Sequence, residues 1–325
     1  MVKAVRIHET GGPEVLIYED VSIAAPGPGE VHIRNEAVGL NFLDVYYRTG
    51  LYPAPDGLPL IPGHEGAGIV LAVGANVQDL KEGDRVAYAN PIGAYAQERL
   101  IPADRLVKVP DAIPLQQAAS MMLKGMTAQY LVRQTFPVRK GDTILFHAAA
   151  GGVGLIAGQW AKHLGATVIG TAGSDDKVRL ALDHGYDHVI NYRTGNFVEQ
   201  VKEHTGGKGV DVVYDSVGKD TFEGSLDCLR PRGMLVGFGQ SSGPVPPFDL
   251  GILARKGSLF LTRPTLFTYI AGREALTKAA DELFELVSQG IIRIEIGQSY
   301  ALKDAATAHR ELEARKTTGT TVLIP

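Results

Sequence analysis

Cysteine is almost absent from this sequence of 325 residues, in which Cys228 is the only one. One cysteine excludes an intramolecular disulfide and a zinc site built from several cysteines. An excess of charge of either sign is also absent, because 32 Lys and Arg stand against 36 Asp and Glu and give a net charge of −4. This balance argues against a strongly basic protein that binds nucleic acid.

No secretory signal is visible in residues 1–10, which carry Lys3, Arg6 and Glu9 and contain no apolar core. The longest uncharged run, residues 143–161, is long enough to cross a membrane. It is rich in glycine, however, and its first half is β-like, so a strand, turn and helix is the better interpretation. We therefore expect a cytoplasmic protein with no membrane partner.

Glycine and proline are abundant, with 39 and 18 residues, and they indicate many tight turns. A chain of 325 residues corresponds to about two domains at roughly 150 residues each. In the first third, short β-like segments alternate with turns and helical periodicity is sparse, which predicts a β-rich domain. These segments are residues 2–7, 15–21, 31–37, 69–73, 85–88 and 93–100.

From about residue 115 the pattern changes to short apolar strands that alternate with helices. Strands are expected at residues 142–147, 167–171, 188–190, 210–214, 234–238, 259–261 and 321–324. Helices are expected at residues 115–134, 155–164, 177–183, 222–229, 273–289 and 305–313. Because a crossover helix returns the chain to the same end of a sheet, this alternation predicts an α/β fold with a parallel sheet.

The strongest motif is the glycine-rich turn AAAGGVG at residues 148–154. Dinucleotide-binding turns carry glycines at their first, third and sixth positions, which here hold Ala149, Gly151 and Gly154. The second glycine lets the backbone approach a pyrophosphate, and the third lets the helix pack closely on the strand. The strand before the turn and the helix after it supply the required context, although Ala149 departs from the pattern. The alternative is a structural turn in another α/β protein.

The end of the following strand distinguishes the two nicotinamide cofactors. NAD-binding proteins usually place Asp or Glu there to bind the ribose 2′-hydroxyl, whereas this strand ends in small residues at 172–174. Ser174 can donate a hydrogen bond to a 2′-phosphate, and Lys177 can supply the opposite charge. Asp175 and Asp176 add negative charge nearby, but acids in the first turn of a helix are favoured by its dipole. The pattern favours NADPH.

Further motifs span the chain: GGPEVL at 11–16, NFLDVY at 41–46, GHEGAG at 63–68, LKGMTA at 123–128, INY at 190–192, VYDSVG at 213–218 and GFG at 237–239. With the glycine-rich turn, they resemble the zeta-crystallin-like NADPH:quinone oxidoreductases, a zinc-free branch of the medium-chain dehydrogenase/reductase superfamily. The resemblance implies a GroES-like β-rich catalytic domain at residues 1–126 and 265–325. It also implies a Rossmann NADPH-binding domain at residues 127–264.

The resemblance implies a set of cofactor-binding residues as well. On the nicotinamide side it places Asn41, Phe42, Tyr46 and Thr127, and at the pyrophosphate Gly152 and Val153. At the adenosine 2′-phosphate and the adenine it places Gly173, Ser174, Lys177 and Tyr192. The remaining wall of the cleft is formed by Ser216, Phe238, Gly239, Ser241, Leu266, Phe267 and Arg315.

No metal site is expected. The motif GHE at residues 63–65 supplies a ligand histidine in zinc-dependent relatives, but the segment 41–44 lacks the cysteine that those relatives use. Cys228 is far away, in a predicted Rossmann helix. Because a catalytic zinc needs three protein ligands, we expect His64 to be a structural polar residue.

Two other classes of function are alternatives. Residues 239–243 match the G-x-S-x-G elbow of hydrolases, and Asp249 and His309 follow in the order of a hydrolase triad. The elbow requires a helix directly after Ser241, however, and the prolines from Pro244 onward prevent one. The second alternative is an NADPH-regulated RNA-binding or structural, crystallin-like protein, as some members of the family are. Few basic residues cluster in this chain, so nucleic acid is not expected as a partner.

These observations predict a zinc-independent NADPH:quinone oxidoreductase that reduces its substrate in an interdomain cleft. Without a strong Lewis acid the acceptor must already be electrophilic, such as a quinone or, as the alternative, an alkenal or enone. Asn41 is expected to fix the nicotinamide side, and Tyr46 and Tyr52 to donate hydrogen bonds to a quinone oxygen. No residue is predicted as a general acid. The resemblance implies a homodimer, which could pair through the strand near residues 259–261.

Overall fold

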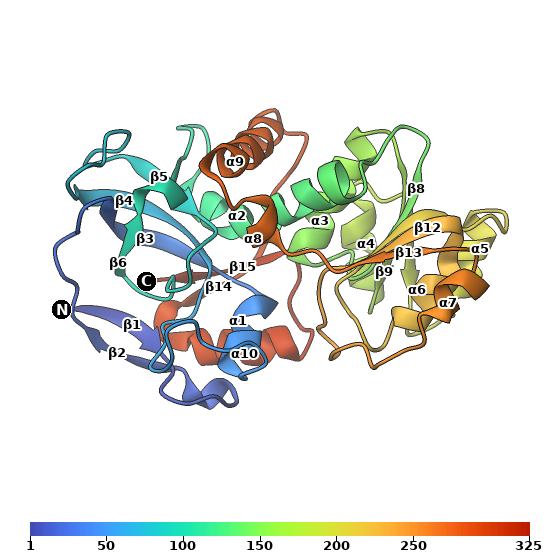
Figure 1. Cartoon of the computed structure of the whole chain (residues 1–325), viewed down its shortest axis with the longest axis horizontal. Helices are drawn as coiled ribbons and strands as arrows, with labels where there is room; N and C mark the ends of the chain where they lie inside the picture. The colour runs from blue at the N-terminus through green and yellow to red at the C-terminus, as the bar shows by residue number, and fades with distance from the viewer. The chain divides into compact units, whose positions relative to one another are not determined.

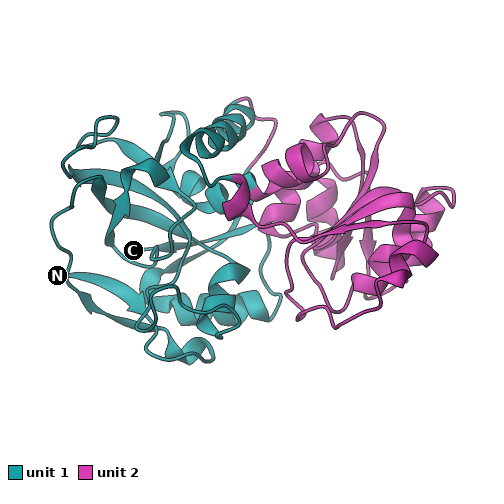
Figure 2. Cartoon of the chain, in the orientation of Figure 1, with its two compact units in different colours: residues 1–126, 270–288, 294–325 teal, residues 127–269, 289–293 magenta.

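The computed structural model describes all residues, 1–325, and the chain folds into two compact units (Figures 1 and 2). The first unit comprises residues 1–126, 270–288 and 294–325. The second comprises residues 127–269 and 289–293. The chain therefore begins and ends in the first unit, and helix α2 (Leu115–Tyr130) contains the boundary between residues 126 and 127.

The first unit is built on a seven-stranded sheet in which β3 is the central strand. Its strands are β3 (Glu30–Leu40), β4 (Glu65–Val73), β5 (Arg85–Tyr88), β6 (Glu98–Pro102), β7 (Val107–Lys108), β14 (Ile296–Ala301) and β15 (Thr320–Ile324). Strand β3 pairs antiparallel with β4, β6 and β15. A separate hairpin joins β1 (Val2–Arg6) to β2 (Ile17–Val21). The helices are α1 (Phe42–Arg48), α9 (Arg273–Ser288) and α10 (Ala305–Glu313).

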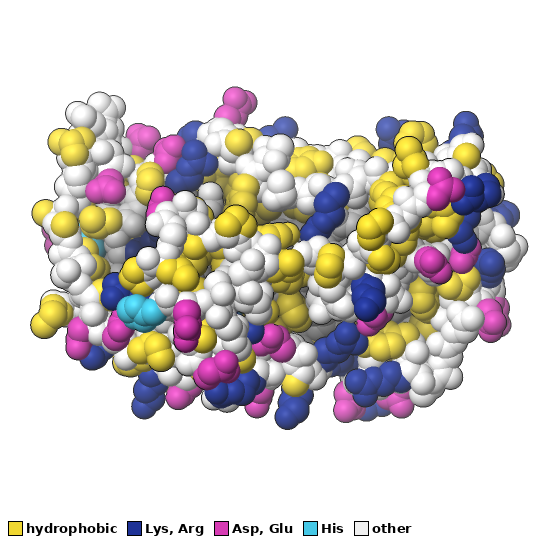
Figure 3. Space-filling model, turned by 60° about the horizontal axis from the view of Figure 1, so that its bottom comes forward, with side chains coloured by type: hydrophobic (Ala, Val, Ile, Leu, Met, Phe, Trp, Pro, Cys, Tyr) yellow, Lys and Arg dark blue, Asp and Glu magenta, His cyan; other side chains and the backbone are white.

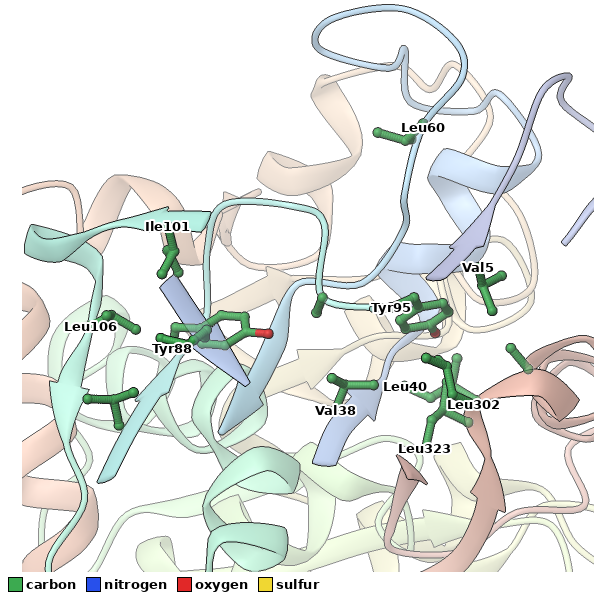
Figure 4. Packing of buried hydrophobic residues seen from close by; sticks show 14 of the residues in the cluster. Val5, Val38, Leu40, Leu60, Tyr88, Tyr95, Ile101, Leu106, Leu302 and Leu323 are labelled. Carbon is green, nitrogen blue, oxygen red and sulfur yellow. The ribbon is translucent and has the colours of Figure 1, made fainter. Parts of the chain in front are cut away.

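The core of this unit lies between its strands because apolar side chains alternate along them. Val31 and Ile33 of β3, two positions apart, are both fully buried, as the period of a strand requires. Figure 4 shows Tyr88 and Tyr95 beside aliphatic side chains of the same cluster, such as Val38. Aromatic rings of this size contribute much of the apolar area that a domain buries.

The second unit contains a six-stranded parallel sheet in the order β10-β9-β8-β11-β12-β13. Its strands are β8 (Thr143–Phe146), β9 (Thr167–Ala172), β10 (His188–Asn191), β11 (Val210–Asp215), β12 (Leu229–Gly237) and β13 (Phe260–Thr262). Its helices are α3 (Gly152–His163), α4 (Asp175–Leu182), α5 (Phe197–His204), α6 (Phe222–Cys228), α7 (Gly251–Arg255) and α8 (Leu266–Tyr269). This is the Rossmann strand order, whose direction reverses between β8 and β11. Ligands of such folds bind at that point, beyond the carboxyl ends of the strands.

The predicted α/β fold class, with a β-rich unit and a parallel-sheet unit, is confirmed. The structure also differs locally from the prediction. Residues 93–97 were expected to be part of a strand, but β6 begins only at Glu98, and Gly93 has a φ of 118° that interrupts extended structure. The short helix α1 was not expected at all. Its start is fixed by Asp44, whose side chain accepts a hydrogen bond from the backbone N–H of Asn41 at 2.9 Å.

None of the helices has both the length and the apolar composition required to span a bilayer. On the face shown in Figure 3, Lys and Arg side chains lie among Asp and Glu side chains, in agreement with the balanced composition.

Candidate functional site

The glycine-rich turn joins β8 to the start of α3, where the fold places anion sites. Gly151 precedes the helix with an extended backbone, and no side chain caps the first N–H groups of α3. A Cβ on Gly154 would lie 2.5 Å from the carbonyl oxygen of Ala148, so only glycine allows the helix to pass this closely. A long helix with an uncapped N-terminus can bind a phosphate through its backbone N–H groups and its dipole. The turn therefore fits a pyrophosphate at Gly152 and Val153.

The ring of Tyr186 packs against this turn, a position that no sequence motif indicated. Its hydroxyl donates a hydrogen bond to the carbonyl oxygen of Gly154 at 2.7 Å. A side chain at Gly158 or Gly170 would collide with the ring, so these glycines make room for it. Burial raises the pKa of Tyr186 well above its usual value, so the hydroxyl keeps the proton that it donates. In the sequence, only Gly158 and Gly170, two further glycines near the nucleotide turn, could have indicated a ring at this place.

The segment after β9 has the small residues that the sequence predicted, and both of its acids are held by partners. Asp175 accepts a hydrogen bond from Asn191 at 2.8 Å, and Asp176 forms an ion pair with Arg179. The hydroxyl of Ser174 caps α4 by accepting from the backbone N–H of Lys177. These partners reduce the repulsion that two free carboxylates would exert on a nearby phosphate.

Gly173 and Tyr192 lie together in the same region. A Cβ on Gly173 would be 2.5 Å from the hydroxyl oxygen of Tyr192, so a larger residue at position 173 would displace the ring. The backbone N–H of Tyr192 donates to the carbonyl oxygen of Ala172, which joins the ends of β9 and β10. The structure thus places the predicted adenosine-side residues on two adjacent strand ends.

The loops that follow β11 and β12 are joined by backbone hydrogen bonds. The carbonyl oxygen of Asp215 accepts from Phe238 at 2.8 Å, and that of Ser216 accepts from Ser241 at 3.1 Å. Gly239 lies so close to Ser216 that a Cβ would be 2.7 Å from its carbonyl oxygen. No helix follows Ser241 until α7 begins at Gly251, so a nucleophile elbow is absent.

The other predicted cofactor residues are distributed between the two units. Thr127 lies on α2 and Leu266 and Phe267 on α8, all in the second unit. Helix α8 is tied to α2 by the stacked rings of Tyr269 and Tyr130, whose centroids are 4.4 Å apart. Arg315 belongs to the first unit, where it is exposed after the end of α10.

The predicted acceptor-side residues gather at α1 in the first unit. The rings of Tyr46 and Tyr52 meet edge to face with centroids 5.3 Å apart, and Tyr47 contacts Tyr52 in the same way at 5.8 Å. Phe42 is 6.4 Å from Tyr46. Tyr52 is half-buried and its backbone N–H donates to the carbonyl oxygen of Tyr46. Asn41 directly precedes this short helix, Tyr46 lies within it and Tyr52 follows it.

A buried carboxylate holds the Asn41 side chain in place. Glu65 at the start of β4 is fully buried, and its Oε1 accepts a hydrogen bond from Asn41 Nδ2 at 2.9 Å. Its Oε2 accepts from the backbone N–H of Leu123 at 2.8 Å, and Lys124 of α2 forms an ion pair with it. No motif in the sequence indicated this role of Glu65 and Lys124. The only local signal was a lysine amid the apolar side chains of α2.

A second buried chain of polar groups holds α1 from its other side. Arg48 donates two hydrogen bonds to Glu313 of α10, at 2.8 and 2.9 Å, and one to His309 Nδ1 at 3.1 Å. His309 Nε2 lies 3.0 Å from the hydroxyl of Tyr95, and that hydroxyl lies 3.1 Å from Asp44. Burial lowers the pKa of His309 to about 3, opposed by Asp44 and assisted by Arg48.

Arg48 fixes the direction of every hydrogen bond in this chain, because a guanidinium can only donate. His309 is neutral and accepts at Nδ1, so its Nε2–H donates to Tyr95. The Tyr95 hydroxyl must then donate to Asp44, whose other oxygen lies 2.9 Å from Nδ1 of His64. His64 and Asp44 are therefore members of a polar network that anchors α1.

The donor atoms around the GHE motif do not fit a zinc ion. Both oxygens of Asp44 and both oxygens of Glu65 already interact with N–H or O–H groups, and the Lys124 ammonium lies against Glu65. Nowhere in the chain do three or more His, Cys, Asp or Glu side chains gather in a manner that could hold a metal ion. Cys228 is buried in α6, and this burial raises the pKa of its thiol to about 12.

Comparison with known proteins agrees with this architecture. The family model of the alcohol dehydrogenase GroES-like domain matches residues 27–111, and that of the zinc-binding dehydrogenases matches residues 152–287. A quinone oxidoreductase of Pseudomonas aeruginosa is 58% identical over the full length of both chains. A 2-haloacrylate reductase of a Burkholderia species is 48% identical over all of this chain and 99% of its own.

The solved structures include one with the same fold throughout. The crystal structure of Escherichia coli quinone oxidoreductase complexed with NADPH has a TM-score of 0.97 and 52% identity, and the match covers 99% of this chain and 100% of that one. Full-length identity of this size, the matched GroES-like domain and the parallel-sheet unit agree with one another. The chain therefore belongs to the quinone oxidoreductase family of the medium-chain dehydrogenase/reductase superfamily.

Proposed function

We propose that this protein is an NADPH:quinone oxidoreductase. The observation that carries the proposal is the uncapped N-terminus of α3, directly after the glycine-rich turn. On the neighbouring strand β9, the two acids that follow the strand end are both held by partners. The relative solved with NADPH supports the same cofactor. When bound, NADPH supplies the reducing equivalents, and the residues of the chain bind and orient the two reactants.

In this proposal the second unit holds the cofactor through the loops at the carboxyl edge of its sheet. Gly152 and Val153 bind the pyrophosphate. Gly173, Ser174, Lys177 and Tyr192 bind the adenosine 2′-phosphate and adenine. Ser216, Phe238, Gly239 and Ser241, with Thr127, Leu266 and Phe267, contact the rest of the cofactor.

The acceptor is bound by the first unit through Asn41, Tyr46 and Tyr52. Two phenols offer apolar area and one hydrogen bond each, which suits a neutral planar diketone. Glu65 Oε1 accepts a hydrogen bond from Asn41 Nδ2, which fixes the orientation of the amide. The donor set around His64 supplies no zinc site, so the carbonyl is polarised by hydrogen bonds from the chain.

An activated alkene is the second candidate for the acceptor. The observation that favours it is the 48% identity to a 2-haloacrylate reductase over all of this chain. An alkenal or enone carries one carbonyl, so it needs only one of the two phenols, whereas a quinone can use both.

Steady-state oxidation of NADPH against a panel of quinones, enals, 2-haloacrylate and alcohols tests the proposal. Quinones should have the highest kcat/KM, and Tyr52→Phe should lower the value for a benzoquinone about two- to tenfold, the loss of one neutral hydrogen bond. Binding of NADPH should not change in this variant. Faster turnover of an enal or 2-haloacrylate than of any quinone would reassign the acceptor.

Lys177 provides the test of the cofactor. Lys177→Ala should raise KM for NADPH about 10- to 100-fold, because a hydrogen bond to a charged group is removed, with little change for NADH. Lys202→Ala, which removes an exposed charge from α5 of the same unit, is the matched control. Equal losses for NADPH and NADH would exclude a contact to the 2′-phosphate.

We also propose that the protein forms a homodimer through β13, the last strand of the parallel sheet. Its outer edge is unpaired, and Phe260 and Leu261 are 57% and 37% exposed. An apolar open edge favours pairing with a second copy. Light scattering should report a dimer that Leu261→Lys converts to a monomer. Leu182→Lys, at an equally exposed leucine of α4, should leave it intact.

A further inference from the structure

Four buried polar side chains form a chain of hydrogen bonds across three neighbouring strands of the parallel sheet. His147 follows β8, Thr171 lies on β9, Asp215 ends β11, and Ser225 lies on α6. His147 Nδ1 is 2.9 Å from the hydroxyl of Thr171, and its Nε2 is 2.9 Å from that of Ser225. The Ser225 hydroxyl is 3.0 Å from Asp215 Oδ2. We call these four residues the strand-end network.

Asp215 determines the direction of these bonds. Its carboxylate also accepts from the backbone N–H groups of Val217 and Gly218 and from the hydroxyl of Thr221, at 2.7 to 3.1 Å. Ser225 has one hydroxyl proton and donates it to Asp215, so it must accept from His147 Nε2–H. Burial lowers the pKa of His147, although the charge of Asp215 opposes this shift. The ring is therefore neutral. Its Nδ1 therefore accepts from Thr171.

This arrangement is different from a nucleophilic triad. In a Ser-His-Asp triad the histidine lies between the serine and the carboxylate and takes the serine proton. Here Ser225 lies between His147 and Asp215, and its proton points to the carboxylate. Ser225 is also completely buried, so no substrate can reach it. The strand-end network has another role.

Each strand-end member of the network directly precedes a loop that is proposed to bind NADPH. His147 precedes the glycine-rich turn, Thr171 precedes residues 172–174, and Asp215 precedes Ser216. Backbone bonds continue the connection, since Ala149 donates to the carbonyl oxygen of Thr171 at 2.9 Å. The three loops thus start from points that are bonded to one another through side chains.

We propose that the strand-end network is a positioning device, which holds the three loops at the mutual spacing that NADPH requires. This inference rests on the proposed function, because the three loops are those assigned to the cofactor. The members are buried, and in this proposal they act through the backbone that follows each of the three strands. Preorganised loops lower the cost of ordering on binding, so the network acts on cofactor affinity.

The test compares cofactor affinity in variants that break or restore one bond. The Kd of NADPH is measured by calorimetry without an acceptor, together with Tm. Thr171→Val and Ser225→Ala should each raise Kd about tenfold, as expected for one buried hydrogen bond, while kcat at saturating NADPH stays within about twofold. Thr171→Ser keeps the hydroxyl and should restore the wild-type Kd. The double variant should lose less NADPH-binding free energy than the sum of the two single variants, because both bonds act through His147.

Tyr214→Phe is the matched control. Its hydroxyl is buried on the same strand β11 but donates to Leu131 and Phe136, away from the three loops. It should lower Tm without changing Kd. Nitrogen-15 NMR of wild-type His147 should report a single tautomer with the proton on Nε2, and a proton on Nδ1 would contradict the direction derived above.

The outcomes separate this inference from the proposed function. If wild-type protein binds NADPH and Thr171→Val lowers Tm with an unchanged Kd, the network is merely structural and the inference is wrong. If Thr171→Ser binds NADPH as weakly as Thr171→Val does, the lost hydroxyl is not the cause of the weaker binding and the inference is also wrong. If wild-type protein binds no NADPH, the proposed function fails and this inference with it.

Discussion

Both units bury a carboxylate at the centre of a polar network, and they stabilise the charge in different ways. In the first unit, Glu65 lies against the ammonium of Lys124. In the second unit, Asp215 forms no ion pair and is stabilised by four hydrogen-bond donors. A cation supplies a large attraction in a buried site but leaves an unpaired charge if it is removed. Backbone and hydroxyl donors divide the stabilisation into smaller parts and fix the loop that supplies them.

The largest expected effect comes from the ion pair. Lys124→Met leaves the Glu65 carboxylate buried without its cation, which should lower the free energy of unfolding by about 3–5 kcal/mol. Chemical denaturation measures the loss. The double variant Glu65→Gln/Lys124→Met removes both charges and should be more stable than Lys124→Met alone. A double variant that is no more stable would show that charge burial is not the cause.

The next effect is a pH dependence in the first unit. The pKa of His309 is about 3 in the folded chain and about 6.5 in an unfolded one, so between these values only the unfolded chain binds the proton. Stability is therefore lost as pH falls. From pH 6 to pH 4 the wild type should lose about 2–3 kcal/mol more than His309→Gln, whose amide can both donate and accept. Parallel stability curves of the two proteins would contradict this.

A smaller loss is expected when Asp215 keeps its shape but loses its charge. Asp215→Asn places an NH₂ group opposite donors whose hydrogen bonds the carboxylate accepted. The substitution should lower the free energy of unfolding by about 2 kcal/mol. Glu223→Gln, at an exposed position on α6, makes the same chemical change and should be neutral. A loss as large as that of Lys124→Met would remove the distinction between the two networks.

The smallest effect compares one hydroxyl in each unit. Tyr95→Phe removes the group between Asp44 and His309, and Tyr214→Phe removes a donor to two backbone carbonyls. Tyr214→Phe should cost about 1 kcal/mol, the usual net value of one hydrogen bond, and Tyr95→Phe about 1–2 kcal/mol, because it also leaves the buried Nε2–H of His309 without its acceptor. Thermal denaturation of both variants gives the comparison. A much larger loss for Tyr95→Phe would mean that the chain from Arg48 to Asp44 is cooperative.

Much of the second unit could be predicted from sequence, because its signals are local. The glycine-rich turn, the missing acid at Ala172 and the alternation of strands and helices each depend on neighbours in the chain. Less of the first unit could be predicted from the sequence. Helix α1 escaped notice because it is short, although the pair Asn41 and Asp44 has the spacing of a helix cap. The single cysteine, Cys228, excluded a disulfide and a cysteine-rich zinc site. The prolines after Ser241 excluded the helix that a hydrolase elbow requires.

The sequence by itself determined the fold class, the nucleotide turn and the absence of any cysteine cluster, since backbone conformation and periodicity are set by residues close together in the chain. Only the tertiary structure decided the partners of the buried polar groups. Arg48 meets His309 across 261 positions and Glu65 meets Lys124 across 59. A buried charge or hydroxyl is stable only with a partner, and that partner is chosen by how the strands and helices pack, which no local pattern records.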